Sequence, residues 1–134
     1  MKVRRVNRYY CDFCKKAGCS SGHMKAHESW CTANPNRTCR MCTLIGEKQR
    51  PLADLKALMP MEYAQPKEFS LDWVDMHADA RAAALIALRE AANDCPVCIL
   101  AALRQQGVMG DGFDFKAEMA EAMKTLNEAH DYEY

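Results

Sequence analysis

The spacing of eight cysteines constrains this 134-residue chain more than any other feature. Six of them form the C-x-x-C pairs Cys11/Cys14, Cys39/Cys42 and Cys95/Cys98. Two thiolates at this spacing can bind one tetrahedral metal ion, whereas disulfide frameworks belong to oxidising compartments. The N-terminus, MKVRRVNRYYCDFC, lacks the apolar segment of a signal peptide, and no stretch approaches the ~20 apolar residues of a membrane span. The sequence therefore predicts an intracellular zinc protein, cytoplasmic or, in a eukaryote, nuclear.

One group of candidate metal ligands lies within residues 9–31. Its spacing is C-x2-C-x12-H-x3-C, with Cys11, Cys14, His27 and Cys31 as the ligands. A tight turn, or knuckle, presents the first two thiolates, and a helix carries two further ligands four residues apart on one face, which completes a tetrahedron. This pattern resembles the C2H2-type zinc finger with its last histidine replaced by cysteine, a C2HC finger.

The resemblance extends to the small core of such a finger. Tyr9 lies two residues before the first ligand, where these fingers carry an aromatic residue, and Met24 takes the place of a core leucine. Gly18 departs from the pattern, because the family usually has phenylalanine there, and we expect Cys19 or Phe13 to fill that space. The overall style is that of small phage or bacterial zinc-finger proteins, a likeness that implies no particular function.

A second choice of ligands is open to the same segment. Cys19 and His23 lie close enough to join Cys11 and Cys14 in a compact knuckle. That pairing would leave the two later ligands without a metal. If the C2HC spacing holds instead, we expect Cys19 to fill space as a small apolar residue and His23 to face solvent.

The two remaining C-x-x-C pairs predict a second metal site. Once the first site has its ligands, Cys39, Cys42, Cys95 and Cys98 are left as two halves of a four-thiolate set. We expect the first half to form a knuckle and the second to begin a helix, an arrangement that resembles treble-clef-like zinc sites with a long helical insertion. The helix macrodipole favours thiolates at a helix start. Zinc is the expected metal, with two ions per chain, and iron is an alternative at this second site.

Between the pairs, the pattern predicts helices and no strand outside the metal knuckles. A short helix over residues 23–31 ends at the turn TANPNRT, and Pro51 and Pro60 bracket the helix LADLKALM. A loop is expected over residues 63–69. We then expect Ser70 to cap a long helix that runs to about Asn93, followed by a helix from Pro96 to Gly107 and a final amphipathic helix capped by Asp114.

Charge divides the chain into two unlike halves. Residues 1–50 hold eleven Lys and Arg against three Asp and Glu, a net charge of +8, and the remainder has a net charge of −8. The predicted fold is therefore mainly α, with a basic C2HC finger (residues 1–38) joined through the four-cysteine site to an acidic helical domain (residues 39–134). A basic half favours a polyanionic partner, unless the two halves attract each other within one molecule or a dimer.

The closed ligand sets argue against an enzyme. Four protein ligands leave no open position on the metal, which is the structural pattern. A zinc deaminase requires H-x-E followed by P-C-x-x-C, whereas here Asp79 replaces the Glu and Pro96 follows Cys95. That pair also follows a helix rather than the strand of a thioredoxin-like enzyme, and a treble-clef nuclease would have only His77 as its base.

The basic half is expected to bind nucleic acid, mostly without reading its sequence. The finger positions that would face bases hold Ser20, Gly22, His23 and Ala26, which offer no Arg for guanine and no amide for adenine. Phosphate contacts, with a tyrosine stacking on a base, are expected instead. The candidate contact residues are Arg4, Arg5, Arg8, Lys15, Lys16, His23, Lys25, Arg37 and Arg40. The alternative for these residues is a solvated face around a metal core.

A competing hypothesis is an adaptor or regulator that binds a host or partner protein through its helical domain. Six methionines suit adaptable apolar contacts, although most of them suit an ordinary core equally well: Met59, Met61, Met76, Met109, Met119 and Met123. No membrane partner is expected.

Overall fold

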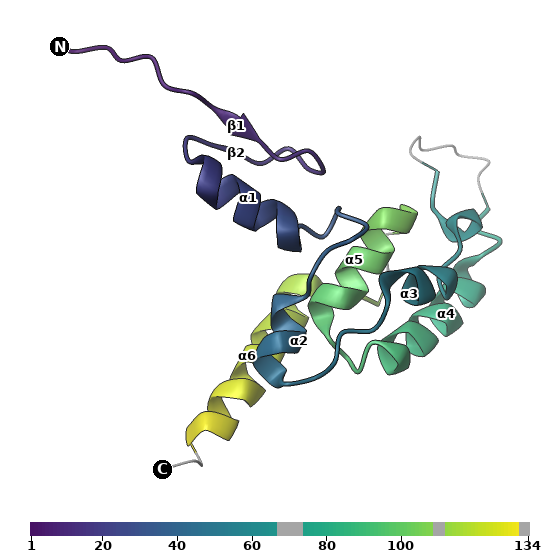
Figure 1. The fold of residues 1–134 in the computed structure, drawn as a ribbon. Coiled ribbons are helices and arrows are strands. Elements are labelled where there is room, and N and C mark those ends of the chain that lie inside the picture. The colour runs from purple at the N-terminus through teal and green to yellow at the C-terminus, as the bar shows by residue number, and fades with distance from the viewer. Residues whose placement is uncertain (67–73, 109–111, 132–134) are drawn as a thin grey trace.

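The computed structural model describes residues 1–66, 74–108 and 112–131, with the backbone alone for residues 130 and 131. In chain order its elements are β1 (Tyr9–Tyr10), β2 (Ala17–Gly18), α1 (Ser21–Trp30), α2 (Arg40–Ile45), α3 (Leu52–Ala57), the 3-10 helix η1 (Met61–Tyr63), α4 (Ala78–Ala91), α5 (Pro96–Gln106) and α6 (Phe115–Asp131). The predicted mainly α fold is confirmed (Figure 1). The division at residue 38 stays a prediction.

A two-stranded hairpin and α1 form the unit that contains the first ligand set, residues 9–31, which we call the finger unit. β1 pairs antiparallel with β2, with Tyr9 opposite Gly18. Ser20 caps α1, because its hydroxyl accepts the backbone N–H of His23 at 3.3 Å. The finger unit lies at one end of the molecule, and residues 1–8 lead away from it (Figure 1).

The small core of the finger unit differs from the expected one at Gly18. Phe13 and Cys19, the two residues expected to replace the missing phenylalanine, are both exposed, so this prediction is wrong. Met24 reaches the space instead, since its terminal methyl carbon lies 4.0 Å from where a Cβ on Gly18 would stand. A long, flexible thioether fills such irregular gaps well. Tyr9 packs against the same cluster.

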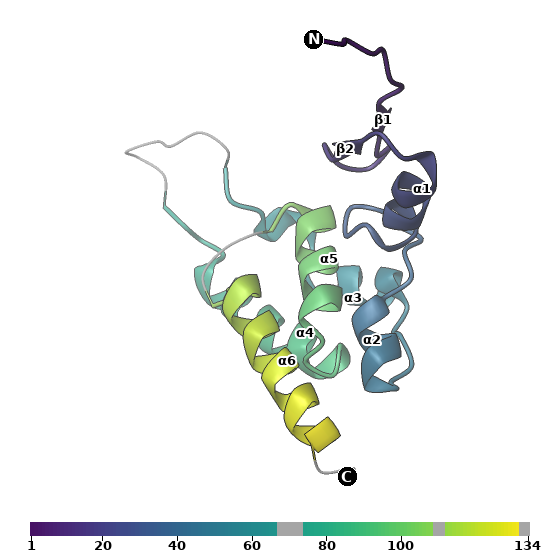
Figure 2. The same cartoon turned by 90° about the vertical axis from the view of Figure 1, so that its left-hand side faces the viewer.

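The helical body is built around α5, which packs against both α3 and α6. Figure 2 shows α5 between these two helices. Ile99, Ala101 and Ala102 of α5 are completely buried, and the two alanines allow the neighbouring helices to approach closely. Leu55 from α3 and Leu88 from α4 complete the centre of this core.

The segment after Cys39 is a helix where a knuckle was expected. α2 begins directly after Cys39, whose Sγ accepts the backbone N–H of Cys42 at 3.4 Å, as the oxygen of an N-cap does. Nothing between Arg40 and Ile45 interrupts a helix, and Gly46 ends it in the left-handed conformation at φ 82°. The knuckle prediction is therefore wrong, although the two cysteines are close together as expected.

The long helix predicted from Ser70 begins later in the structure, at Ala78. Asp75 accepts the backbone N–H of His77 and forms an ion pair with Arg81, so the chain turns just before α4. Val74, which the predicted helix would have included, is 73% exposed. Ser70 and the rest of residues 67–73 lie outside the described residues.

The other helix signals are confirmed. α3 follows Pro51, and α5 runs from Pro96 to a C-cap at Gly107 with φ 69°. Asp114 caps α6, because its Oδ1 accepts the backbone N–H groups of Lys116 and Ala117 at 3.1 and 3.3 Å. A proline thus marks the start of α3 and of α5, and a side-chain cap marks the start of α6.

Candidate metal centres

The first centre gathers Cys11, Cys14, His27 and Cys31. One ligand atom from each of them lies within 4.8 Å of the other three, and Cys14 Sγ is 3.2 Å from His27 Nε2. Cys19 and His23 are not in this group and both are exposed. The C2HC set is therefore the one that the fold brings together, and the compact alternative pairing is not.

The turn before β2 places the first two sulfurs. Cys11 donates its backbone N–H to the carbonyl of Lys16 at 2.9 Å, which closes the turn. Backbone N–H groups of Phe13 and Lys16 point at the sulfurs of Cys11 and Cys14, each at 3.4 Å. Such donors stabilise thiolates and orient them toward a metal.

The electrostatics at Cys14 favour ionisation on balance. Burial opposes the charged form, but the backbone N–H of Lys16 and the neighbouring His27 lower the pKa of Cys14 to about 7. Burial, the largest cause at Cys31, raises the pKa of that thiol above its usual value. Cys14 and His27 are half-buried and Cys11 and Cys31 are buried, so the centre is partly open to solvent.

The second centre gathers Cys39, Cys42, Cys95 and Cys98, all of them buried. Their sulfurs lie within 4.8 Å of one another, with 3.6 Å between Cys39 and Cys95 and 3.5 Å between Cys42 and Cys98. Each pair begins a helix: Cys39 precedes α2 and Cys95 precedes α5. The centre thus joins two helix starts that are far apart in sequence, inside the main core.

The distances in both centres fit a tetrahedral metal better than disulfides. Zn–S bonds of about 2.3 Å and Zn–N bonds of about 2.0 Å imply S···S edges of about 3.8 Å and S···N edges of about 3.5 Å. The measured separations of 3.6, 3.5 and 3.2 Å are close to these values. A disulfide would require about 2.05 Å, and all eight cysteines are free.

The four buried thiols of the second centre differ in how readily they ionise. Hydrogen bonds from Cys95 and Cys98 hold the pKa of Cys39 far below its usual range. Burial, followed by the interaction with Cys39, raises the pKa of Cys42 to about 12, and the contacts with Cys39 and Cys95 raise the pKa of Cys98 as well. One thiolate therefore forms at the expense of the others. A metal ion bound here would supply the positive charge that lets all four ionise.

Gln49 supports the second centre and was not anticipated from the sequence. Its Oε1 accepts the backbone N–H of Cys39 at 2.6 Å, and its Nε2 donates to the carbonyl of Arg37 at 3.0 Å. The side chain thus fixes the approach of the chain to the first sulfur of this centre. A lone glutamine in an irregular segment carries no periodic or motif signal, so only the fold could reveal this role.

The segment between the centres is held to α5 by side-chain amides. Asn34 is buried and donates to the carbonyl of Glu28 at 2.7 Å. Gln105 donates to the carbonyls of Thr32 and Asn34 at 3.0 and 2.9 Å, and Arg104 donates to the Thr32 hydroxyl at 2.8 Å. These bonds connect the finger unit to the helical body independently of either metal centre.

The predicted nucleic-acid contact residues are not all exposed to solvent, where a phosphate could reach them. Arg4, Arg5, Arg8, Lys15, Lys16, His23, Lys25 and Arg40 are exposed. Arg37 is only 5% exposed, and its Nε donates to the carbonyl of Trp30 at 3.2 Å, so its assignment as a phosphate contact is wrong. The Arg40 guanidinium lies 4.2 Å from the ring centre of Trp30. Both arginines therefore serve the segment that leads into the second centre.

No helix among the described residues is long and apolar enough to cross a membrane. Comparison with known proteins found no matching family model, no matching curated protein and no matching solved structure. Function must therefore be inferred from the chain's own geometry.

Proposed function

We propose that the protein is a non-enzymatic zinc-binding protein whose basic N-terminal part binds nucleic acid, mostly without reading sequence. Two structural zinc ions, one per centre, hold its fold together. The finger unit has a three-sulfur, one-nitrogen ligand set and the helical body a four-sulfur set, both of which suit zinc. Neither set keeps a ligand position for substrate, which supports a structural role.

The observation that supports nucleic-acid binding is the exposed positive charge on the finger unit and its N-terminal arm. The exposed bases there include Arg4, Arg5, Arg8, Lys15, Lys16 and Lys25. Within residues 1–31 only Asp12 and Glu28 carry negative charge, and Glu28 already accepts the backbone N–H of Asp12 at 3.2 Å. Several cations on one small unit attract phosphates and release their counterions on binding.

An aromatic side chain accompanies these cations. Tyr10 is 63% exposed on β1, and the Arg8 guanidinium carbon lies 6.0 Å from the centre of its ring. An exposed ring beside cations suits stacking on an unpaired base, with phosphates on either side. Lys16 and His23 also line one shallow hollow of about 240 Å³ at the start of α1, which adds a further basic position.

Sequence-specific reading is not part of the proposal. Ser20, Gly22 and His23 are exposed at the positions that would face bases, and none of them recognises a base with two hydrogen bonds as Arg or Asn does. Most of the expected affinity then comes from contacts with the phosphate backbone of the nucleic acid. The affinity should therefore depend strongly on salt and weakly on nucleotide sequence.

Fluorescence anisotropy with single-stranded DNA, duplex DNA and RNA, measured from low to physiological salt, tests this proposal. For single strands, the variant Lys15→Ala/Lys16→Ala should reduce the magnitude of the slope of log affinity against log salt by about 1.4. The reason is that each phosphate contact contributes about 0.7 to this slope. The matched control Lys116→Ala/Lys124→Ala removes two exposed lysines of α6 and should leave the slope unchanged. Absence of binding to all three ligands at low salt would overturn the proposal.

A further inference from the structure

A groove of about 590 Å³ runs between the finger unit and the helical body. The end of α1, the following segment, α2, α5 and α6 all contribute to it, with Trp30, Arg40, Leu44, Leu100, Arg104 and Met119 among the lining residues. Its volume lies within the range of about 300–1,000 Å³ typical of ligand sites. Neither half of the chain forms this groove alone.

The interior of the groove is apolar. Phe115, Met119 and Met123 follow one another at four-residue spacing along one face of α6, and Leu100 of α5 lies beside them. Leu44 of α2 is 60% exposed at the edge of the groove. Methionine and aromatic side chains adapt to the apolar face of a bound helix, as in other helix-binding grooves.

Charge on the groove has a single sign. None of the described residues that line it is Asp or Glu, whereas Arg40 and Arg104 are exposed arginines on its edge. Each of these arginines is held in place, Arg40 over the Trp30 ring and Arg104 by its bond to the Thr32 hydroxyl. Cations fixed before binding lose little conformational entropy when a carboxylate arrives.

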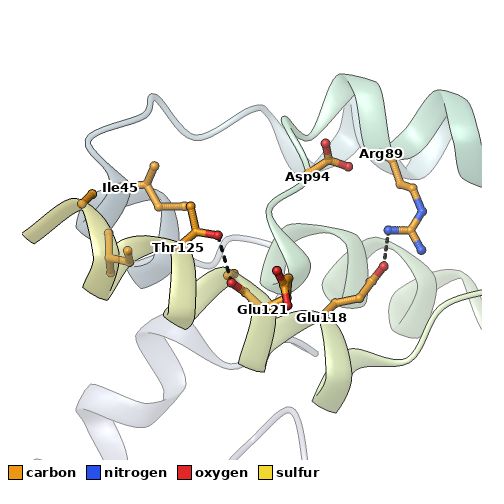
Figure 3. A pocket seen from close by; sticks show the side chains of 9 residues that line it. Ile45, Arg89, Asp94, Glu118, Glu121 and Thr125 are labelled. Carbon is orange, nitrogen blue, oxygen red and sulfur yellow. Dashed lines mark hydrogen bonds and ion pairs between the residues drawn. The ribbon is translucent and has the colours of Figure 1, made fainter.

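A second hollow on α6 has the opposite charge. It measures about 510 Å³ and is lined by Asp94, Glu118 and Glu121 together with apolar residues (Figure 3). Arg89 also lines it, but its guanidinium already forms an ion pair with Glu118. The basic character of the first groove is therefore a local property, not a general one of the helical body.

We propose that the groove binds an acidic amphipathic helix of a partner protein. Apolar side chains on one face of that helix would enter between α5 and α6, and its carboxylates would meet Arg40 and Arg104. A nucleic acid is a poor match for the methionine-rich interior, because it exposes little apolar surface. This interaction is additional to nucleic-acid binding, which the proposed function places on the hairpin and the N-terminal arm.

Three fluorescein-labelled synthetic peptides of about 18 residues, or five helical turns, test the proposal. The first has Leu at i, i+3, i+4 and i+7 with Glu between; the second has the same composition in scrambled order; the third has Lys in place of Glu. Anisotropy with the zinc-loaded full chain should show the first peptide binding at least about tenfold more tightly than either of the others. Equal binding of all three would overturn the proposal.

Two pairs of variants locate the binding surface. Leu44→Glu puts a carboxylate into the groove and should weaken binding of the first peptide by about tenfold. Its control, Ile86→Glu, changes a leucine-sized side chain on α4 that is 68% exposed and should have no effect. Arg40→Glu should weaken binding similarly, while Arg50→Glu, an exposed arginine outside the groove, should not. Zinc content and circular dichroism confirm that every variant folds.

Two other results would also reject this partner. If sedimentation shows a dimer that Leu44→Glu dissociates, a second copy of this chain covers the groove. If an oligonucleotide displaces the peptide and Leu44→Glu abolishes oligonucleotide binding, the groove binds nucleic acid instead. Unchanged peptide affinity in Lys15→Ala/Lys16→Ala would support two separate surfaces.

Discussion

At the scale of single residues, side-chain amides connect the segments beside the metal centres to the rest of the fold through hydrogen bonds. Gln49 bridges the backbone of Arg37 and Cys39, and Gln105 bridges Thr32 and Asn34. Each glutamine satisfies two backbone groups in an irregular segment, where no helix or sheet partner exists for them. These residues decide how accurately the ligands are placed.

Replacing Gln49 by alanine should therefore affect the second centre selectively. The backbone N–H of Cys39 loses its acceptor, which should lower the free energy of unfolding by about 1 kcal/mol and weaken metal binding at this centre by about 10- to 100-fold. Urea denaturation and competition with a chromophoric chelator measure the two effects. Gln65→Ala, at an exposed glutamine, is the control. An unchanged metal affinity would show that Gln49 has no positioning role.

The predictions from sequence succeeded at residues whose chemistry is local. The ligand spacing, the helix-starting Pro96 and the caps Gly107 and Asp114 act within a few positions, so they can be identified without a fold. Arg37 was misassigned because its burial, with Nε bonded to the Trp30 carbonyl, depends on how residues 32–38 pack, which the sequence pattern does not reveal. The glutamine bridges were missed for the same reason.

At the scale of elements, the finger unit and α2 show how a metal ligand and a helix start depend on each other. α1 carries His27 on its last turn and delivers Cys31 directly after its end. The helix α2 begins at a ligand, Cys39, and is only six residues long. Helices this short are marginal in water on their own, so we expect both to depend on a metal ion at the neighbouring centre and on the packing around it.

The finger unit should unfold when one of its ligands is removed, and His27→Ala tests this. The small core around Met24 cannot replace the energy of metal binding, so the dispersed amide signals of residues 9–31 should collapse and one zinc should be lost. His27→Cys should restore the metal, because a fourth thiolate also completes a tetrahedron. NMR spectra and elemental analysis provide the readouts.

Cys19→Ser is the matched control for these ligand variants. Cys19 is exposed and lies outside the ligand cluster, so this change should leave both the spectrum and the zinc content unaltered. Loss of zinc in Cys19→Ser, with retention in His27→Ala, would reverse the ligand assignment in favour of the compact pairing.

At the scale of the whole molecule, the two centres differ in how they depend on the rest of the chain. The first takes its ligands from residues 11–31 and has its own small core. The second joins residues 56 positions apart and lies within the main core of the body. The halves are then connected by the bonds from Arg104 and Gln105 to the segment after the finger unit. The sequence predicted two centres but could not show this connection, because it depends on how α5 packs.

Metal removal should consequently occur in two steps. The first centre has half-buried ligands at Cys14 and His27 and should release zinc quickly to EDTA, whereas the second is buried on all four sulfurs and should release it only when the body unfolds. Native mass spectrometry over time should show two-zinc, one-zinc and metal-free chains in that order. Cys95→Ser should remove the slow step and unfold the body, since three thiols and a serine hydroxyl without metal would remain in its core. His27→Ala should remove only the fast step, and release of both ions at one rate would contradict independent centres.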